Sequence, residues 1–154
     1  MNDELIRELE EKRDEFRRAI AGLTGQEVER TVPGNDWTIR SVLAHLASSE
    51  RGQRVVSEIM VAKKGYNFKP LDRNQWNASE IEKRASASLA EIVAEWEENR
   101  QKFIDFFAGL DEEQLGYEGT HHFWGDITTQ YVAEQLMRHQ AEHQAEIVAA
   151  RERE

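Results

Sequence analysis

Residues 132–147, VAEQLMRHQAEHQAEI, decide the fold of this chain. Their apolar members Val132, Leu136 and Ile147 fall in line with His139 and His143, because steps of three and four residues keep side chains on one face of an α-helix. The two imidazoles thus stand in a stripe predicted to be buried, where a ring nitrogen without a partner costs free energy. A metal ion is one group that satisfies both rings at once, since it binds one nitrogen of each.

His139 and His143 are one helical turn apart, in an H-x-x-x-H arrangement that allows both rings to bind the same ion. The alternative is a pair of core histidines that are only hydrogen-bonded. The chain contains no cysteine, which excludes disulfides, thiolate nucleophiles and sulfur-ligated zinc. A metal would therefore be held by histidine and carboxylate side chains.

Three further segments have the same helical period. The first is predicted to end at Gly22, the second near Gly65 and the third at Gly109, since glycine commonly follows the last helical turn. Their apolar residues are Leu5, Leu9, Phe16, Ile20 and Leu23; then Ile39, Val42, Leu43, Leu46, Val56 and Met60; then Ile81, Ala85, Leu89, Ile92, Trp96, Phe103 and Phe107.

The third segment opens with Ser79 and Glu82, whose spacing predicts a capping box that satisfies free amides at a helix start. The fourth segment begins around Thr128, and no strand-like alternation of useful length appears. Four amphipathic helices in a chain of this length predict an all-α fold, a four-helix bundle, as one domain spanning residues 1–154.

The connection between the second and third helices, residues 65–78, is a long crossover loop for a bundle. It carries Tyr66, Phe68, Trp76 and Asn77. Such loops often cover a site; aromatic side chains that only pin the loop to the bundle are the alternative. Asn77 would either face a substrate or cap a helix.

Charge and hydropathy narrow the class of partner. The chain has 30 acidic and 20 basic residues, for a net charge of -10. This charge repels phosphate backbones, so we expect no nucleic-acid partner. No apolar run has the length needed to span a bilayer, and the charged N-terminal segment is unlike a signal peptide. We therefore expect a cytoplasmic protein without a membrane partner, whose ligand is a small molecule.

A third metal ligand should come from another helix, and His45 is the best candidate. It lies at the edge of the apolar stripe of the second helix. Ser49 and Gly52 follow on the same side, and their small size leaves room for an ion or a substrate beside the ring. The alternative is a histidine at a helix–helix boundary that donates one hydrogen bond.

Two stretches of the chain resemble a known family. Residues 36–50, DWTIRSVLAHLASSE, and residues 138–143, RHQAEH, are similar to the two halves of the signature of the DinB/YfiT-like superfamily. The resemblance covers nearly the whole chain, including the helix order and the long crossover. It implies a four-helix bundle in which His45, His139 and His143 hold a divalent metal. The related mycothiol-dependent maleylpyruvate isomerases have a glutamate where His139 stands, so the chain is more similar to the three-histidine branch.

The three-histidine branch includes bacillithiol transferases and metal-dependent hydrolases. The resemblance thus implies a divalent-metal-dependent enzyme, either a thiol S-transferase that uses a low-molecular-weight thiol or a hydrolase, acting on a small reactive molecule. Three imidazoles suit zinc, nickel and iron alike. The alternative is a non-catalytic bundle that binds or sequesters a small molecule, with or without metal, since residues 76–88 also resemble colibactin self-resistance proteins. A homodimer is compatible with the mixed surface charge.

Other polar residues near the predicted site are weaker candidates. Glu146 lies two turns after His139, so it could orient a ligand, accept a proton or add a coordinating atom; a partly exposed carboxylate without a role is the alternative. Glu142 is a lower-ranked candidate for contact with a ligand ring. We expect His121 and His122 to be solvated loop residues, and Asp126 to help cap the fourth helix.

Overall fold

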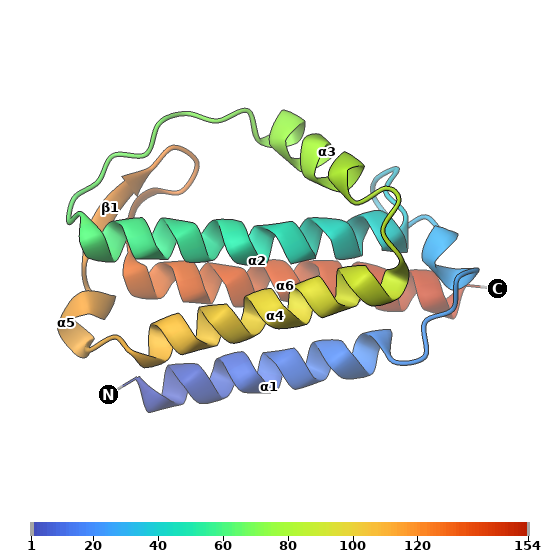
Figure 1. Ribbon diagram of the computed structural model, residues 1–154, viewed down its shortest axis with the longest axis horizontal. Coiled ribbons are helices and arrows are strands. Elements are labelled where there is room, and N and C mark those ends of the chain that lie inside the picture. The colour runs from blue at the N-terminus through green and yellow to red at the C-terminus, as the bar shows by residue number, and fades with distance from the viewer. Residues whose placement is uncertain (1, 154) are drawn as a thin grey trace.

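The computed structural model describes residues 2–153, and within them four long helices lie side by side (Figure 1). This confirms the predicted four-helix bundle. The long helices are α1 (Asp3–Ile20), α2 (Ile39–Ala62), α4 (Leu89–Ala108) and α6 (Thr129–Glu152). The shorter elements are η1 (Glu27–Glu29), α3 (Arg73–Lys83), α5 (Glu112–Leu115), β1 (Glu118–His121) and β2 (Gly125–Thr128). None of the helices in this part of the chain is long and apolar enough to cross a lipid bilayer.

The order of the helices around the bundle explains the long crossover. Helices α1 and α2 each pack against both α4 and α6. Figure 1 shows that α2 and α4 run in the same direction, so the chain must return along the bundle between them. Residues 63–88 make this return, and α3 lies within them across the outside of α2.

The bundle core is built from most of the predicted apolar residues, but Ile81 and Ala85 of the predicted third stripe lie outside it, in α3 and the turn that follows. Phe16 on α1 packs on Trp96 of α4 with 4.6 Å between ring centroids, and Phe103 stacks on Phe107 at the same separation. These four rings are at most 1% exposed. Because burying a large apolar side chain stabilises a fold by about 1.5–3 kcal/mol, such contacts hold the four helices together.

The predicted start of the third long helix is wrong. Ser79 and Glu82 lie inside α3, which begins 16 residues before α4 and has Asp72 as its N-cap. The long helix α4 begins instead after Ser88, which forms a capping box with Glu91. Two serine–glutamate pairs with the same spacing stand in this segment, and the sequence pattern alone favoured the wrong one.

The side chain of Arg40 explains why the chain breaks between α3 and α4. Its guanidinium, on the first turn of α2, donates to the backbone carbonyls of Arg84, Ala85 and Ala87. These carbonyls lie beyond the end of α3 and would have no helical partner there. Arg84 in turn pairs with Glu95 of α4 at 2.6 Å, which fixes the turn between the two helices.

A small hairpin that the sequence did not predict precedes α6. Strands β1 and β2 are antiparallel and have four residues each, too few for alternation to be recognised. Thr128 is the N-cap of α6 and accepts from the amide of Tyr131. Asp126 accepts from Thr120 across the hairpin at 2.9 Å instead, so the prediction that Asp126 helps to cap this helix is wrong.

Candidate metal centre

Three histidine rings from two helices meet in the bundle. His45 comes from α2, and His139 and His143 come from successive turns of α6. Nε2 of His139 lies 2.9 Å from Nε2 of His45 and 3.2 Å from Nε2 of His143. The structure thus brings together the three predicted residues, with their candidate ligand atoms within 4.8 Å of one another.

The start of α2 fixes where His45 stands. Thr38 caps this helix by accepting from the amide of Ser41 at 3.1 Å, so His45 lies two turns inside it. Ser48 and Ser49 donate their hydroxyls back to the carbonyl of His45. The imidazole itself is 6% exposed, and its Nδ1 has no hydrogen-bond partner among the described residues.

The three rings cannot satisfy one another. An imidazole nitrogen either donates one hydrogen or accepts with one lone pair in the ring plane. Nε2 of His139 faces the Nε2 atoms of both His45 and His143, so it can pair well with only one of them. A cation among the three nitrogens accepts a lone pair from each, which is the arrangement that zinc and similar ions take from histidine.

The electrostatics keep the rings of His45 and His139 neutral. Burial, and then the neighbouring charges of His139, His143 and Arg73, lower the pKa of His45 to about 2. Burial, followed by His143 and Arg73, lowers the pKa of His139 to about 3. Neutral imidazole is the form that binds a metal, so at neutral pH both rings are ready to do so.

Glu146 lies beside the third ring. Its Oε1 is 2.9 Å from Nδ1 of His143, a contact distance, although the orientation is not that of a hydrogen bond. The other oxygen, Oε2, accepts from Nδ2 of Asn35 at 3.5 Å. A carboxylate next to the far nitrogen of a histidine commonly sets the orientation of a ligating ring, and Glu146 is placed for that role. Glu142 is exposed on the same helix.

Trp37 forms one wall of the site. Its ring centroid lies 5.0 Å from that of His45 and 6.2 Å from that of His143, with which it is stacked. Nearby, Oδ1 of Asn35 accepts from the amide of Trp37 at 2.6 Å and so fixes the turn that leads into α2. The indole therefore shields two of the three rings from water.

His121 and His122 do not join the cluster. Nδ1 of His121 accepts from the amides of Phe123 and Trp124 at 3.1 and 3.3 Å, and its ring stacks on Trp124. Burial and the adjacent His122 lower the pKa of His121 to about 4. His122 is exposed. Both belong to the hairpin, where His121 ties the turn together.

The space beside His45 differs from the prediction. Gly52 does not leave room for a ligand, because Trp76 of α3 fills it: Cη2 of the indole lies 3.5 Å from the position of a Cβ at Gly52. Ser49 is likewise turned towards the backbone. The crossover thus covers α2, as its length suggested, and Asn77 lies half-buried within α3 and is not its cap.

Sequence reasoning did not place Trp37 or Asn35 at the site. Trp37 and Asn35 stand just before α2, so their nearness to His45 follows from the turn of the chain rather than from helical spacing. Arg73 lies far from all three histidines along the chain, and its charge makes the smallest contribution to the lowered pKa values of His45 and His139. The one sequence signal that could have predicted the contact of Trp37 with the rings is an aromatic residue shortly before a helix that carries a histidine.

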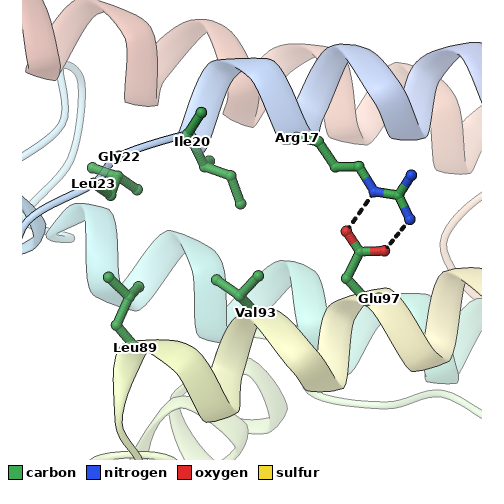
Figure 2. Close-up of a pocket in the computed structure, with 8 residues that line it drawn as sticks. Arg17, Ile20, Gly22, Leu23, Leu89, Val93 and Glu97 are labelled. Carbon is green, nitrogen blue, oxygen red and sulfur yellow. Dashed lines mark hydrogen bonds and ion pairs between the residues drawn. The ribbon is translucent and has the colours of Figure 1, made fainter.

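A separate hollow lies between the end of α1 and the start of α4 (Figure 2). Its volume is about 260 Å³, and Arg17 pairs with Glu97 along one side at 2.6 Å. The remaining lining residues are Ile20, Ala21, Gly22, Leu23, Leu89 and Val93. This hollow contains no histidine, and its two charged residues pair with each other, so the three rings are the better candidate for a functional site.

Comparison with known proteins supports the fold and the family. The family model described as DinB superfamily matches residues 8–147, a span that contains all three histidines. No curated protein sequence is significantly similar to this chain.

Two solved structures share the fold. YfiT from Bacillus subtilis, described as a probable metal-dependent hydrolase with an unusual four-helix bundle topology, is 21% identical with a TM-score of 0.82, over 97% of this chain and 85% of YfiT. TT2238, described as a four-helix bundle protein, is 18% identical with a TM-score of 0.68, over 97% of this chain and 99% of TT2238. At such identities the similarity shows a common fold only.

Proposed function

This chain belongs to the DinB superfamily, and we propose that it is a divalent-metal-dependent enzyme that hydrolyses a small molecule. His45, His139 and His143 are the proposed metal ligands. The observation that carries this proposal is the meeting of three Nε2 atoms that no set of mutual hydrogen bonds satisfies. Zinc, nickel and iron all suit such a ligand set.

The number of ligands favours catalysis over a structural role. Three protein ligands leave coordination positions open, whereas structural zinc sites are closed by four. When bound, a divalent ion at such a site acidifies a water molecule and polarises a carbonyl group, which together permit hydrolysis near neutral pH.

The surrounding residues hold the three rings in one arrangement. Trp37 covers His45 and His143 on one side and keeps water from that face. Glu146, with Oε1 2.9 Å from Nδ1 of His143, is the proposed residue that orients this ring. The lowered pKa values of His45 and His139 keep their nitrogens free of protons at neutral pH.

Hydrolysis is preferred to thiol transfer because its second reactant is water. The chain has no cysteine, so thiol transfer would need a low-molecular-weight thiol as a further ligand. The description of YfiT as a probable metal-dependent hydrolase is in line with this choice.

The test combines elemental analysis with an activity screen. The untagged protein is purified without added metal, its metal content is measured, and small esters, amides and lactones are assayed with and without a chelator. We expect about one divalent ion per chain. We also expect hydrolysis of at least one substrate class that the chelator abolishes and added metal restores.

The variant His139→Ala and the matched control His122→Ala decide where the metal binds. His122 is exposed in the hairpin, so its replacement should leave the metal content unchanged. His139→Ala removes the ring that faces both of the others and should lose most of the metal. Equal metal content in His139→Ala and the wild type would overturn the three-histidine site. If the wild type retains metal and does not hydrolyse any substrate, but transfers an added thiol, the proposed function would be thiol transfer rather than hydrolysis.

A further inference from the structure

A buried polar cluster joins α2, α4 and α6 next to the three histidine rings. Arg100 of α4 is fully buried, and its Nη2 donates to Oε1 of Glu50 on α2 at 2.6 Å. The same Nη2 donates to Oε1 of Gln140 on α6, also at 2.6 Å. Glu50 and Gln140 are themselves buried. One guanidinium therefore links the two helices that carry the proposed metal ligands.

The points where this link is attached lie close to the ligands along each helix. Gln140 directly follows His139, and Glu50 follows His45 by five residues. Because an α-helix rises about 1.5 Å per residue, these offsets are about 1.5 and 7.5 Å along the two helix axes. The link thus holds both helices within about one and a half turns of the rings.

Two further buried contacts keep the cluster itself in place. Asn99, which directly precedes Arg100, donates from Nδ2 to the carbonyl of Ala47 on α2 at 3.0 Å. Gln140 donates from Nε2 to the carbonyl of Lys12 on α1 at 2.7 Å. The position of α6 is therefore referred to α1 as well as to α4, and α2 is held by α4 at two neighbouring points.

The histidine site depends on how α2 and α6 are placed along each other. These helices run in opposite directions (Figure 1), so a slip of one past the other moves His45 away from His139 and His143. A metal–nitrogen distance varies by only about 0.2 Å, much less than the rise of about 1.5 Å for one residue. Apolar contacts are non-directional, whereas hydrogen bonds have narrow ranges of distance and angle. Buried polar groups are accordingly the devices that best fix the register of packed helices.

We propose that Arg100 is a positioning residue for the metal ligands. Through Glu50 and Gln140 it sets the register of α2 and α6 at which the three Nε2 atoms converge on one ion. This inference rests on the proposed function, since it concerns the same site. Arg100 acts through the two helices rather than by contact with the ion or the substrate. The competing role is stability alone, in which case the metal site would tolerate the loss of the link.

Cobalt(II) titration of two variants separates these roles. Gln140→Leu removes the contact on α6 and leaves the ion pair of Arg100 with Glu50 intact. The double variant Arg100→Met with Glu50→Leu removes the whole link without leaving a lone buried charge. The visible absorption of cobalt reports both its affinity and its coordination. We expect the affinity to fall about tenfold or more in both variants, as it does when other residues that hold metal ligands are removed. We also expect the visible band to weaken as water replaces a nitrogen ligand.

The matched control is Phe107→Leu, which weakens the core of α4 two turns beyond Arg100 and leaves the polar link intact. We expect lower stability to urea but a cobalt affinity within about twofold of the wild type, because distant sites contribute independently. Gln140→Leu is the milder of the two test variants and decides the question if the double variant does not fold.

Three results would overturn this inference. Wild-type cobalt affinity and spectrum in either test variant would show that the site does not need the link, while bound cobalt would still support the proposed function. An equal loss of affinity in Phe107→Leu would assign the effect to general stability. Failure of the wild type to bind cobalt would overturn the proposed function, and the role of Arg100 with it.

Discussion

Two buried polar clusters in the same bundle differ in whether the protein satisfies them. In the first, Arg100 of α4 is fully buried and donates to both carboxylate oxygens of Glu50 on α2, with its closest contact at 2.6 Å. It also donates to the carbonyl of Leu9 on α1 and to Oε1 of Gln140 on α6. Gln140 passes the network on by donating to the carbonyl of Lys12. One side chain thus joins all four long helices.

The second cluster lies next to the first along α6, where His139 directly precedes Gln140. Here His45, His139 and His143 direct their Nε2 atoms at one another, and His45 leaves Nδ1 without a partner. Burial of the polar atoms in the first cluster is tolerated because each atom has a hydrogen-bond partner. Burial in the second cluster is unfavourable because some ring nitrogens have no such partner. The comparison indicates that the arginine cluster is complete in itself and that the histidine cluster fits an external cation.

The largest expected effect comes from breaking the complete cluster. Arg100→Met leaves the carboxylate of Glu50 buried without its partner, and we expect the free energy of unfolding to fall by about 3–5 kcal/mol. Urea denaturation measures this loss. Replacing both residues, Arg100→Met with Glu50→Leu, should recover at least half of it, because no lone charge then remains. If Arg100→Met alone were as stable as the wild type, this cluster would not be structural.

Zinc should stabilise the second cluster. At free zinc about 100 times its dissociation constant, we expect the free energy of unfolding to rise by about 2.7 kcal/mol, by mass action on the folded state. His45→Leu should abolish this gain, and its metal-free form should be no less stable than the metal-free wild type, since a buried ring with an unpartnered nitrogen is removed. Thermal unfolding with and without zinc measures both. If zinc stabilised His45→Leu as much as the wild type, the histidine cluster would not be the zinc site.

Replacing the carboxylate beside the histidines should have a smaller effect. Glu146→Gln keeps the shape of the side chain but removes the charge near Nδ1 of His143, and we expect metal affinity to fall about 10- to 100-fold. Competition with a chromophoric chelator measures the affinity. Glu142→Gln, an exposed glutamate one turn earlier on α6, is the matched control and should have no effect. Equal metal affinities for Glu146→Gln and Glu142→Gln would show that Glu146 has no role in metal binding.

The smallest expected effect concerns a histidine that the backbone does satisfy. His121 must be neutral to accept from two amides, and its pKa is lowered to about 4. In the unfolded chain, His121 takes up a proton near pH 6.5. The contribution of the neutral His121 ring to stability is therefore complete above pH 6.5 and is lost as the pH falls to about 4. The ring is half-exposed, so we expect less than about 1 kcal/mol. His121→Phe should show a shallower loss of stability over this range, measured by urea denaturation at several pH values.

The four helical stripes and the three histidines could be predicted because each depends on local spacing. Steps of three and four residues put the half-buried His139 and His143 on the same face as the buried Leu136 and Ile147. Other parts could not be predicted in this way. Whether Ser79 or Ser88 starts the third long helix, α4, depends on Arg40, which satisfies the carbonyls between α3 and α4 from a distant part of the chain.

Gly52 shows the same limit within the site. Its small size correctly indicated a close approach on α2, but the sequence could not say that the approaching group is Trp76 rather than a ligand. Arg73 had no local pattern at all, and its contact with the ring of Phe123 joins α3 to the distant hairpin.

The sequence by itself determined the fold class, the family and the identity of the three histidines, because helical periodicity and short motifs act over neighbouring residues. Only the tertiary structure decided how the three Nε2 atoms meet and that Trp37 and Glu146 border them. These arrangements join residues from distant parts of the chain, and they follow from how whole helices pack rather than from any local preference.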